Sequence, residues 1–94
     1  MADVTISGPL PTLTELAIAT SPSVVTVPLG VASVALLETT AGLMLSQDGT
    51  TYTTPSTTAG LVLWSSASRT GGSFSVKLSG GGPLTRQLDV RDHL

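Results

Sequence analysis

Apolar and polar residues alternate strictly in two stretches near the C-terminal end of the chain. From Ser73 to Leu78, a phenylalanine, a valine and a leucine alternate with two serines and a lysine. The stretch Leu84–Val90 alternates in the same way, with Arg86 at one position on its apolar side. A period of two residues predicts antiparallel strands with one buried face.

Two further stretches are apolar on both faces. Val31–Leu37 combines valines and leucines with two small alanines, and Leu61–Trp64 has no polar residue at all. This pattern predicts strands buried between two layers of a sandwich. Shorter runs rich in β-branched or long apolar residues, Val24–Val27 and Leu43–Ser46, predict two more strands.

The segment Thr12–Ala19 has two interpretations. Leu16 and Ile18 lie on one face of a strand, which favours β structure. A helix is the alternative, because Thr12 and Glu15 have the spacing of a capping box and several apolar residues have helical spacing. We favour a strand because the neighbouring segments are strands.

A hairpin is predicted in the middle of the chain. Val31–Glu38 and Leu43–Ser46 are strand-like, and Asp48-Gly49 separates the second of them from Thr50–Thr54. Asp-Gly suits a type I′ turn, in which both central residues have positive φ. We therefore expect Thr50–Thr54 to form a strand paired with the run before the turn.

These segments predict an all-β domain, an antiparallel β-sandwich or jelly roll of about seven or eight short strands. The expected organisation is an extended N-terminal arm over residues 1–11, the sandwich over residues 12–90 and a C-terminal tail over residues 91–94. The arm contains the short alternating run Val4–Ile6 before Gly8, Pro9 and Pro11. It is expected to add to a sheet edge, either its own or that of a neighbour.

Composition limits the possible partners. The chain has 94 residues, no cysteine, a net charge of −2 and only 11% charged residues, whereas soluble domains average about 25%. Four basic residues cannot form the basic patch that nucleic-acid binding needs. A single small domain without disulfides gains further burial by assembling, so a homo-oligomer is expected.

No membrane partner is expected. Leu16–Leu37 is uncharged, but Pro22, Pro28 and Gly30 interrupt it well before the ~20 apolar residues that a bilayer requires. Met1-Ala2-Asp3 lacks the basic start of a secretory signal.

The sequence contains no evident catalytic set. His93 is the only histidine and lies next to the end, where residues are usually solvated. The carboxylates are scattered, Asp48 is explained by its turn, and Gly80-Gly81-Gly82 lacks the lysine and helix of a phosphate loop. We therefore expect no enzyme activity, no cofactor and no metal.

Several residues are candidates for a protein interface. Arg86 lies on the apolar side of its strand. Either the register slips there, or its guanidinium contacts a carboxylate such as Asp89 or a partner chain, or it protects a sheet edge from aggregation. Trp64 is a core or interface residue, or forms a sugar-stacking platform with Tyr52. The candidate interface residues are Val4, Ile6, Trp64, Arg69, Arg86 and Arg91.

The middle of the chain resembles the small all-β head decoration (cement) proteins of tailed bacteriophages. The resemblance covers roughly residues 28–90 and is carried by Pro28–Val34, by Leu43–Tyr52 with its Ser-x-Asp-Gly-Thr-x-Tyr hairpin, and by Gly60–Leu63. It implies a sandwich that trimerises and sits on the virion surface. There it would bind the major capsid protein and bridge capsid subunits. Tail and fibre modules look similar, which leaves a carbohydrate- or receptor-binding module as the alternative.

Overall fold

The computed structural model describes residues 3–55 and 59–93 of the chain. These residues form eight short strands and no helix. The strands are β1 (Val4–Thr5), β2 (Thr12–Ile18), β3 (Ser23–Val27), β4 (Ser33–Leu36), β5 (Leu43–Ser46), β6 (Leu61–Ser65), β7 (Gly72–Leu78) and β8 (Leu84–Arg91).

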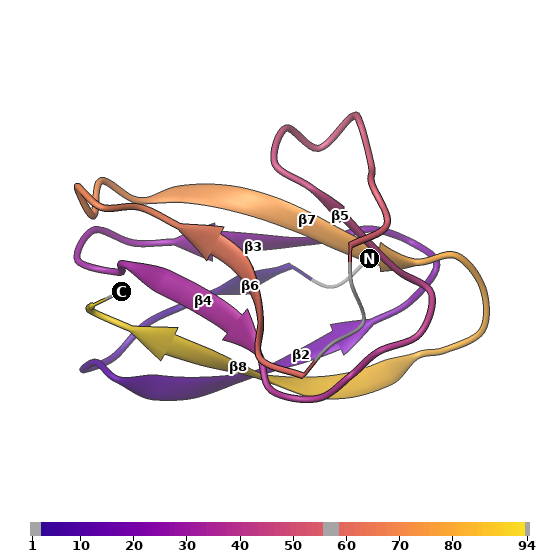
Figure 1. The fold of residues 1–94 in the computed structure, drawn as a ribbon, viewed down its shortest axis with the longest axis horizontal. Coiled ribbons are helices and arrows are strands. Elements are labelled where there is room, and N and C mark those ends of the chain that lie inside the picture. The colour runs from indigo at the N-terminus through magenta and orange to yellow at the C-terminus, as the bar shows by residue number, and fades with distance from the viewer. Residues whose placement is uncertain (1–2, 56–58, 94) are drawn as a thin grey trace.

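The strands pack as a sandwich of two four-stranded sheets (Figure 1). The first sheet has the order β1-β3-β7-β5 and the second sheet has the order β2-β8-β4-β6. The pairs are antiparallel, except that β1 runs parallel to β3. The predicted all-β sandwich is confirmed. Odd-numbered strands form one sheet and even-numbered strands the other, so every connection crosses between the layers.

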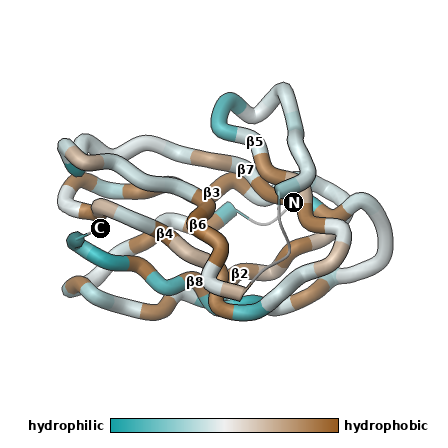
Figure 2. Tube along the Cα trace, in the orientation of Figure 1, coloured by the Kyte–Doolittle hydropathy of each residue, from teal (hydrophilic) through white to brown (hydrophobic). Residues whose placement is uncertain are grey.

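The core lies between the inward faces of the two sheets. Alternation along each strand sends every second side chain inward, and Figure 2 shows the hydrophobic positions recurring along the strands. The predicted apolar face of β7 is buried at Phe74, Val76 and Leu78. The buried cluster comprises Ile6, Leu16, Ile18, Val25, Val27, Val31, Val34, Leu36, Leu43, Leu63, Phe74, Val76, Leu78, Leu88 and Val90.

The strand interpretation of Thr12–Ala19 is confirmed. β2 pairs with β8 in one continuous register, from Thr12 opposite Val90 to Ile18 opposite Leu84. Leu16 and Ile18 enter the core while Glu15 and Ala17 are exposed. The ladder and this alternation stabilise a strand, whereas a helix would place only part of the apolar set against the core.

The N-terminal arm belongs to the sandwich. Val4–Thr5 forms β1 at the edge of the first sheet, opposite Val25 and Thr26. Ile6 is buried in the core, and its backbone N–H donates to the Thr26 carbonyl over 3.0 Å. The arm therefore adds to its own sheet. Residues 1 and 2 of the arm and residue 94 of the tail lie outside the described residues.

The predicted strand Thr50–Thr54 does not form. A single bridge pairs Leu45 with Thr53, and Asp48 lacks the positive φ that a type I′ turn requires, while Gly49 has φ 79°. Asp48 Oδ1 instead accepts the backbone N–H groups of Thr50 (2.8 Å) and Thr51 (2.9 Å). These local bonds compete with a ladder. The loop after β5 therefore projects from the sandwich, as Figure 1 shows.

Candidate functional site

The outer face of the second sheet carries a row of side chains that crosses all four strands. Leu13 on β2 lies opposite Asp89 on β8, Asp89 lies opposite Ala35 on β4, and Ala35 lies opposite Val62 on β6. Three of the four members are apolar. We call Leu13, Ala35, Val62 and the adjacent Leu37 the apolar face.

The apolar face is exposed to solvent. Leu13 is 58% exposed, Val62 53% and Leu37 41%. Among the described residues only one other large hydrophobic side chain is comparably exposed, and that is Leu29, which lies in the loop before β4. Clustered apolar exposure of this kind marks interaction sites, whereas scattered single residues do not.

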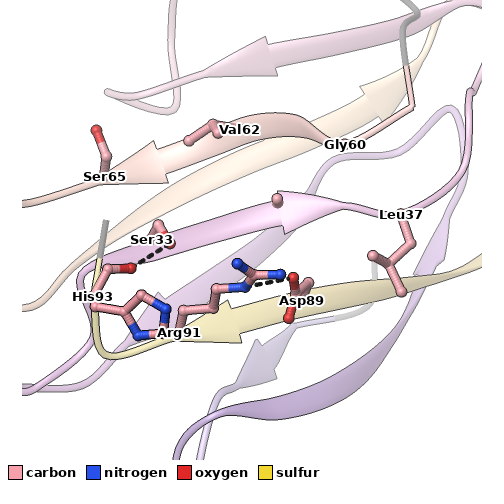
Figure 3. Close-up of a pocket in the computed structure, with 9 residues that line it drawn as sticks. Ser33, Leu37, Gly60, Val62, Ser65, Asp89, Arg91 and His93 are labelled. Carbon is pink, nitrogen blue, oxygen red and sulfur yellow. Dashed lines mark hydrogen bonds and ion pairs between the residues drawn. The ribbon is translucent and has the colours of Figure 1, made fainter.

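A shallow concavity of about 550 Å³ lies on this face (Figure 3). Ala35, Leu37 and Val62 line it with apolar surface, and Arg91 and His93 lie at the end nearest the C-terminus. Ala35, Val62 and Arg91 lie on β4, β6 and β8, whose hydrogen-bonded ladders hold them side by side.

The ionisable side chains beside the concavity are paired with one another. Arg91 Nε lies 2.8 Å from Asp89 Oδ2, and His93 Nδ1 lies 3.0 Å from Asp92 Oδ1. Hydrogen bonding to the His93 ring lowers the pKa of Asp92 below its ordinary value. The face therefore offers apolar contact area rather than a free charge for a small ion.

Ser33 and His93, which both line the concavity, do not form a nucleophilic pair. The Ser33 hydroxyl donates to the backbone carbonyl of His93 over 3.4 Å, while the His93 ring is engaged by Asp92. A serine nucleophile needs its hydroxyl on the imidazole nitrogen. Within residues 3–55 and 59–93, no three His, Cys, Asp or Glu side chains gather as a metal site.

Three of the predicted interface residues pack within the protein. Ile6 is only 2% exposed, and Val4 packs half-buried against the same core. Trp64 also packs against the core, and its indole lies close to Gly72, where an added Cβ would be 3.5 Å from the ring. Ile6 in particular is not available to a partner.

Arg86 ties β8 to the loop after β4. Its Nε donates to Thr40 Oγ1 over 3.1 Å, and its Nη1 lies 3.4 Å from Glu38 Oε2. It therefore contacts a carboxylate, but Glu38 rather than Asp89. The interpretation as edge protection does not apply, because β8 lies between β2 and β4.

Arg69 and Arg91 are both exposed but lie in different settings. Arg69 has φ 54° and its Nε donates to the Asp92 carbonyl over 2.7 Å, which fastens the loop after β6 to the C-terminal end. Arg91 alone among the predicted interface residues lines the concavity. The structure therefore does not gather the six residues into one site.

Trp64 and Tyr52, the two residues of the predicted sugar-stacking platform, each make a contact of their own. Lys77 Nζ lies 4.4 Å from the centroid of the Tyr52 ring. Trp64 packs by Gly72 and lines a second groove, of about 320 Å³, with Gln47 and Ser65.

The apolar face was not predicted from the sequence, although the signal was present. Val31–Leu37 and Leu61–Trp64 are apolar on both faces, a pattern that predicts burial of both faces. Val34 and Leu36 of β4 do enter the core, but Leu37 and Val62 face outward. An apolar pattern on both faces of a strand thus indicates either a third layer or a face left for a partner.

The described residues include no helix long and apolar enough to cross a membrane. Comparison with protein-family models, with curated proteins and with solved structures finds no match.

Proposed function

We propose that this chain is a structural virion protein, a decoration or cement protein that binds the outside of a phage capsid. In this proposal it acts as a homo-oligomer, a trimer, and its partner is the major capsid protein. The apolar face is the observation that carries the proposal, because it offers binding area without reactive groups. The resemblance of residues 28–90 to head decoration proteins supplies the kind of partner.

The size of the apolar face supports a binding role. Leu13, Leu37 and Val62 are each about half exposed. Burying the exposed part of one such side chain against a partner contributes about 1 kcal/mol to the free energy of binding. Three such side chains change an affinity by roughly two orders of magnitude. Repetition of the same weak contact over a particle surface, or within an oligomer, would raise the retention further.

The test compares binding to phage heads assembled without this protein. A triple variant with Leu13→Ser, Leu37→Ser and Val62→Ser is the probe, and Leu29→Ser is the matched control because Leu29 is 77% exposed but lies off the face. We expect the triple variant to lose co-sedimentation with heads and to lose any rise in particle melting temperature. The control should behave like the unaltered protein.

Two results would contradict the proposal. The unaltered protein could fail to bind any head at micromolar concentration, or the triple variant could bind as well as the Leu29→Ser control. Circular dichroism and thermal melting of the free variants establish that each one is folded.

The groove beside Trp64 supports a second candidate, a carbohydrate- or receptor-binding module of a tail or fibre. An aromatic ring with nearby polar groups such as Gln47 and Ser65 is suited to stacking against a sugar. The Gln47 amide already donates to the Leu63 carbonyl over 2.9 Å, which leaves fewer free donors. Glycan binding that Trp64→Ala abolishes in a folded protein would favour this candidate over the first.

A further inference from the structure

The sandwich has four edge strands, and three of them are short or capped. β1 has two residues. The outer edge of β5 is closed by Thr53, which exchanges two backbone hydrogen bonds of 2.9 Å with Leu45. The outer edge of β6 is capped in part by the side chain of Gln47, which donates to the Leu63 carbonyl.

The fourth edge, that of β2, is long and open. The Leu37 N–H donates to the Gln87 carbonyl, so the backbone groups of Gln87 face β4. Glu15 lies opposite Gln87 on the other side of β8, and its own N–H and C=O therefore point away from β8. By the same alternation, Leu13 and Ala17 also direct their backbone groups outward.

Few contacts within the described part of the chain occupy these outward groups. The Ser23 hydroxyl donates to the Ala17 carbonyl over 3.1 Å, and β2 pairs with no strand other than β8. The seven residues of β2 contain no proline and no lysine, and their register with β8 has no shift. Proline, lysine and a β-bulge are usual features that protect an edge strand from pairing. Because β2 has none of them, it remains able to pair with another strand.

Glu15 is the only charged residue on β2, and it is exposed. If two copies paired antiparallel through β2 with Leu13 opposite Ala17, the two Glu15 side chains would lie directly opposite each other. Like charges in that position destabilise a sheet, while a basic residue opposite Glu15 stabilises it. The edge of β2 can therefore pair with a strand of another protein, whereas repulsion between the two Glu15 side chains disfavours this antiparallel pairing with a second copy of the chain.

We propose that the free edge of β2 adds an extended segment of a partner protein, with a lysine or arginine opposite Glu15. Added there, the segment would lengthen the second sheet and lie beside Leu13 of the apolar face. In this arrangement Glu15 determines specificity, because it attracts the basic strand and disfavours self-pairing. The inference needs only a protein partner and stands independently of whether that partner is a capsid.

The experiment uses a charge-reversed copy of the chain as the basic strand. Protein carrying Glu15→Lys is labelled with a fluorophore and mixed with the unaltered protein, and association is measured by anisotropy and by sedimentation equilibrium. We expect the mixed dimer to form roughly tenfold more tightly than either protein associates with itself, since repulsion across the strands becomes attraction.

Two variants control for the position of the contact and for net charge. Ala17→Pro removes an outward N–H while leaving the bonds to β8, so it should abolish the mixed dimer and retain the circular dichroism of the fold. Glu38→Lys makes the same change of charge away from β2 and should not associate with the unaltered protein.

Three outcomes would overturn the inference. The mixture could associate no more tightly than its components, or Glu38→Lys could associate equally well. Alternatively, the unaltered protein could already form an oligomer that Ala17→Pro dissociates, in which case a second copy occupies the edge. None of these measurements involves phage heads, so they are independent of the outcome of the proposed function.

Discussion

The outer faces of the two sheets differ in composition and in what covers them. The first sheet directs mostly hydroxyl and charged groups outward, among them Ser46 opposite Ser75 and Lys77 on β7. Ser46 and Ser75 are nonetheless buried where the loop after β5 begins, and Gly49 lies near the Ser75 hydroxyl. The second sheet directs Leu13 and its apolar neighbours outward, and these remain exposed.

A monomer would gain more stability if its longest loop covered the apolar outer face and left the polar outer face exposed. Covering an apolar face stabilises a protein by about 25 cal/mol per Å², whereas covering hydroxyl groups requires a hydrogen bond for each. The chain uses its longest connection near the polar face, where Ser46 donates to Asp48 and accepts from the Gly49 N–H, both over 2.8 Å. The apolar face is left available for another molecule.

The largest expected loss of stability separates the last residue of β4, which is buried, from the exposed residue that follows it. Leu36 is buried, so Leu36→Ala should lower the free energy of unfolding by about 2–5 kcal/mol. Leu37, the next residue, is 41% exposed, and Leu37→Ala should lower it by less than about 1 kcal/mol. Urea unfolding of both variants measures the difference. Similar losses for the two would mean that another layer covers Leu37.

The sequence predicts the strands better than it predicts their surroundings. Alternation at Phe74 and Val76 defines β7 because a sheet with one buried face requires it. By contrast, the apolar character of Leu37 and Val62 indicates that these side chains favour burial, but it does not indicate which part of the molecule or which partner covers them. The order of strands within each sheet also depends on contacts between distant segments, which no local pattern around Leu13 or Asp89 encodes.

The predicted hairpin between Leu43–Ser46 and Thr50–Thr54 was wrong for a local reason. Asp-Gly does mark a turn, but the Asp48 carboxylate has its own acceptor geometry toward Thr50 and Thr51. Those bonds fix the backbone after Gly49 in a conformation that leaves only Thr53 to reach β5.

The loop after β5 is expected to have an intermediate effect on stability, through the ionisation of Asp48. The backbone N–H groups of Thr51 and Thr50, with the Ser46 hydroxyl, lower the pKa of Asp48 from 3.8 to about 2. The unfolded chain regains the ordinary value, so the carboxylate contributes stability above about pH 4 and loses it as the pH falls toward 2. Asp48→Asn should therefore flatten the dependence of stability on pH in this window.

Urea midpoints at intervals between pH 2 and pH 5 provide the measurement. An Asp48→Asn protein with the same slope as the unaltered chain would show that these hydrogen bonds do not hold the loop in solution. The variants Leu13→Ser, Leu37→Ser and Val62→Ser remove none of the groups that lower the pKa of Asp48, so they should leave this slope unchanged.

The smallest expected losses of stability come from replacing one cationic side chain on each outer face. Lys77 lies over Tyr52, which comes from the loop, and this cation–π contact is worth about 0.5–1 kcal/mol. Arg91 pairs with Asp89 on its own strand, with 53% of its side chain exposed, and such pairs contribute about 0–0.5 kcal/mol. Lys77→Met should therefore cost more stability than Arg91→Met, measured by thermal and urea unfolding of the two variants in parallel. A larger loss for Arg91→Met would mean that the second face is closed within the free protein, because an ion pair contributes that much only when water is excluded from it.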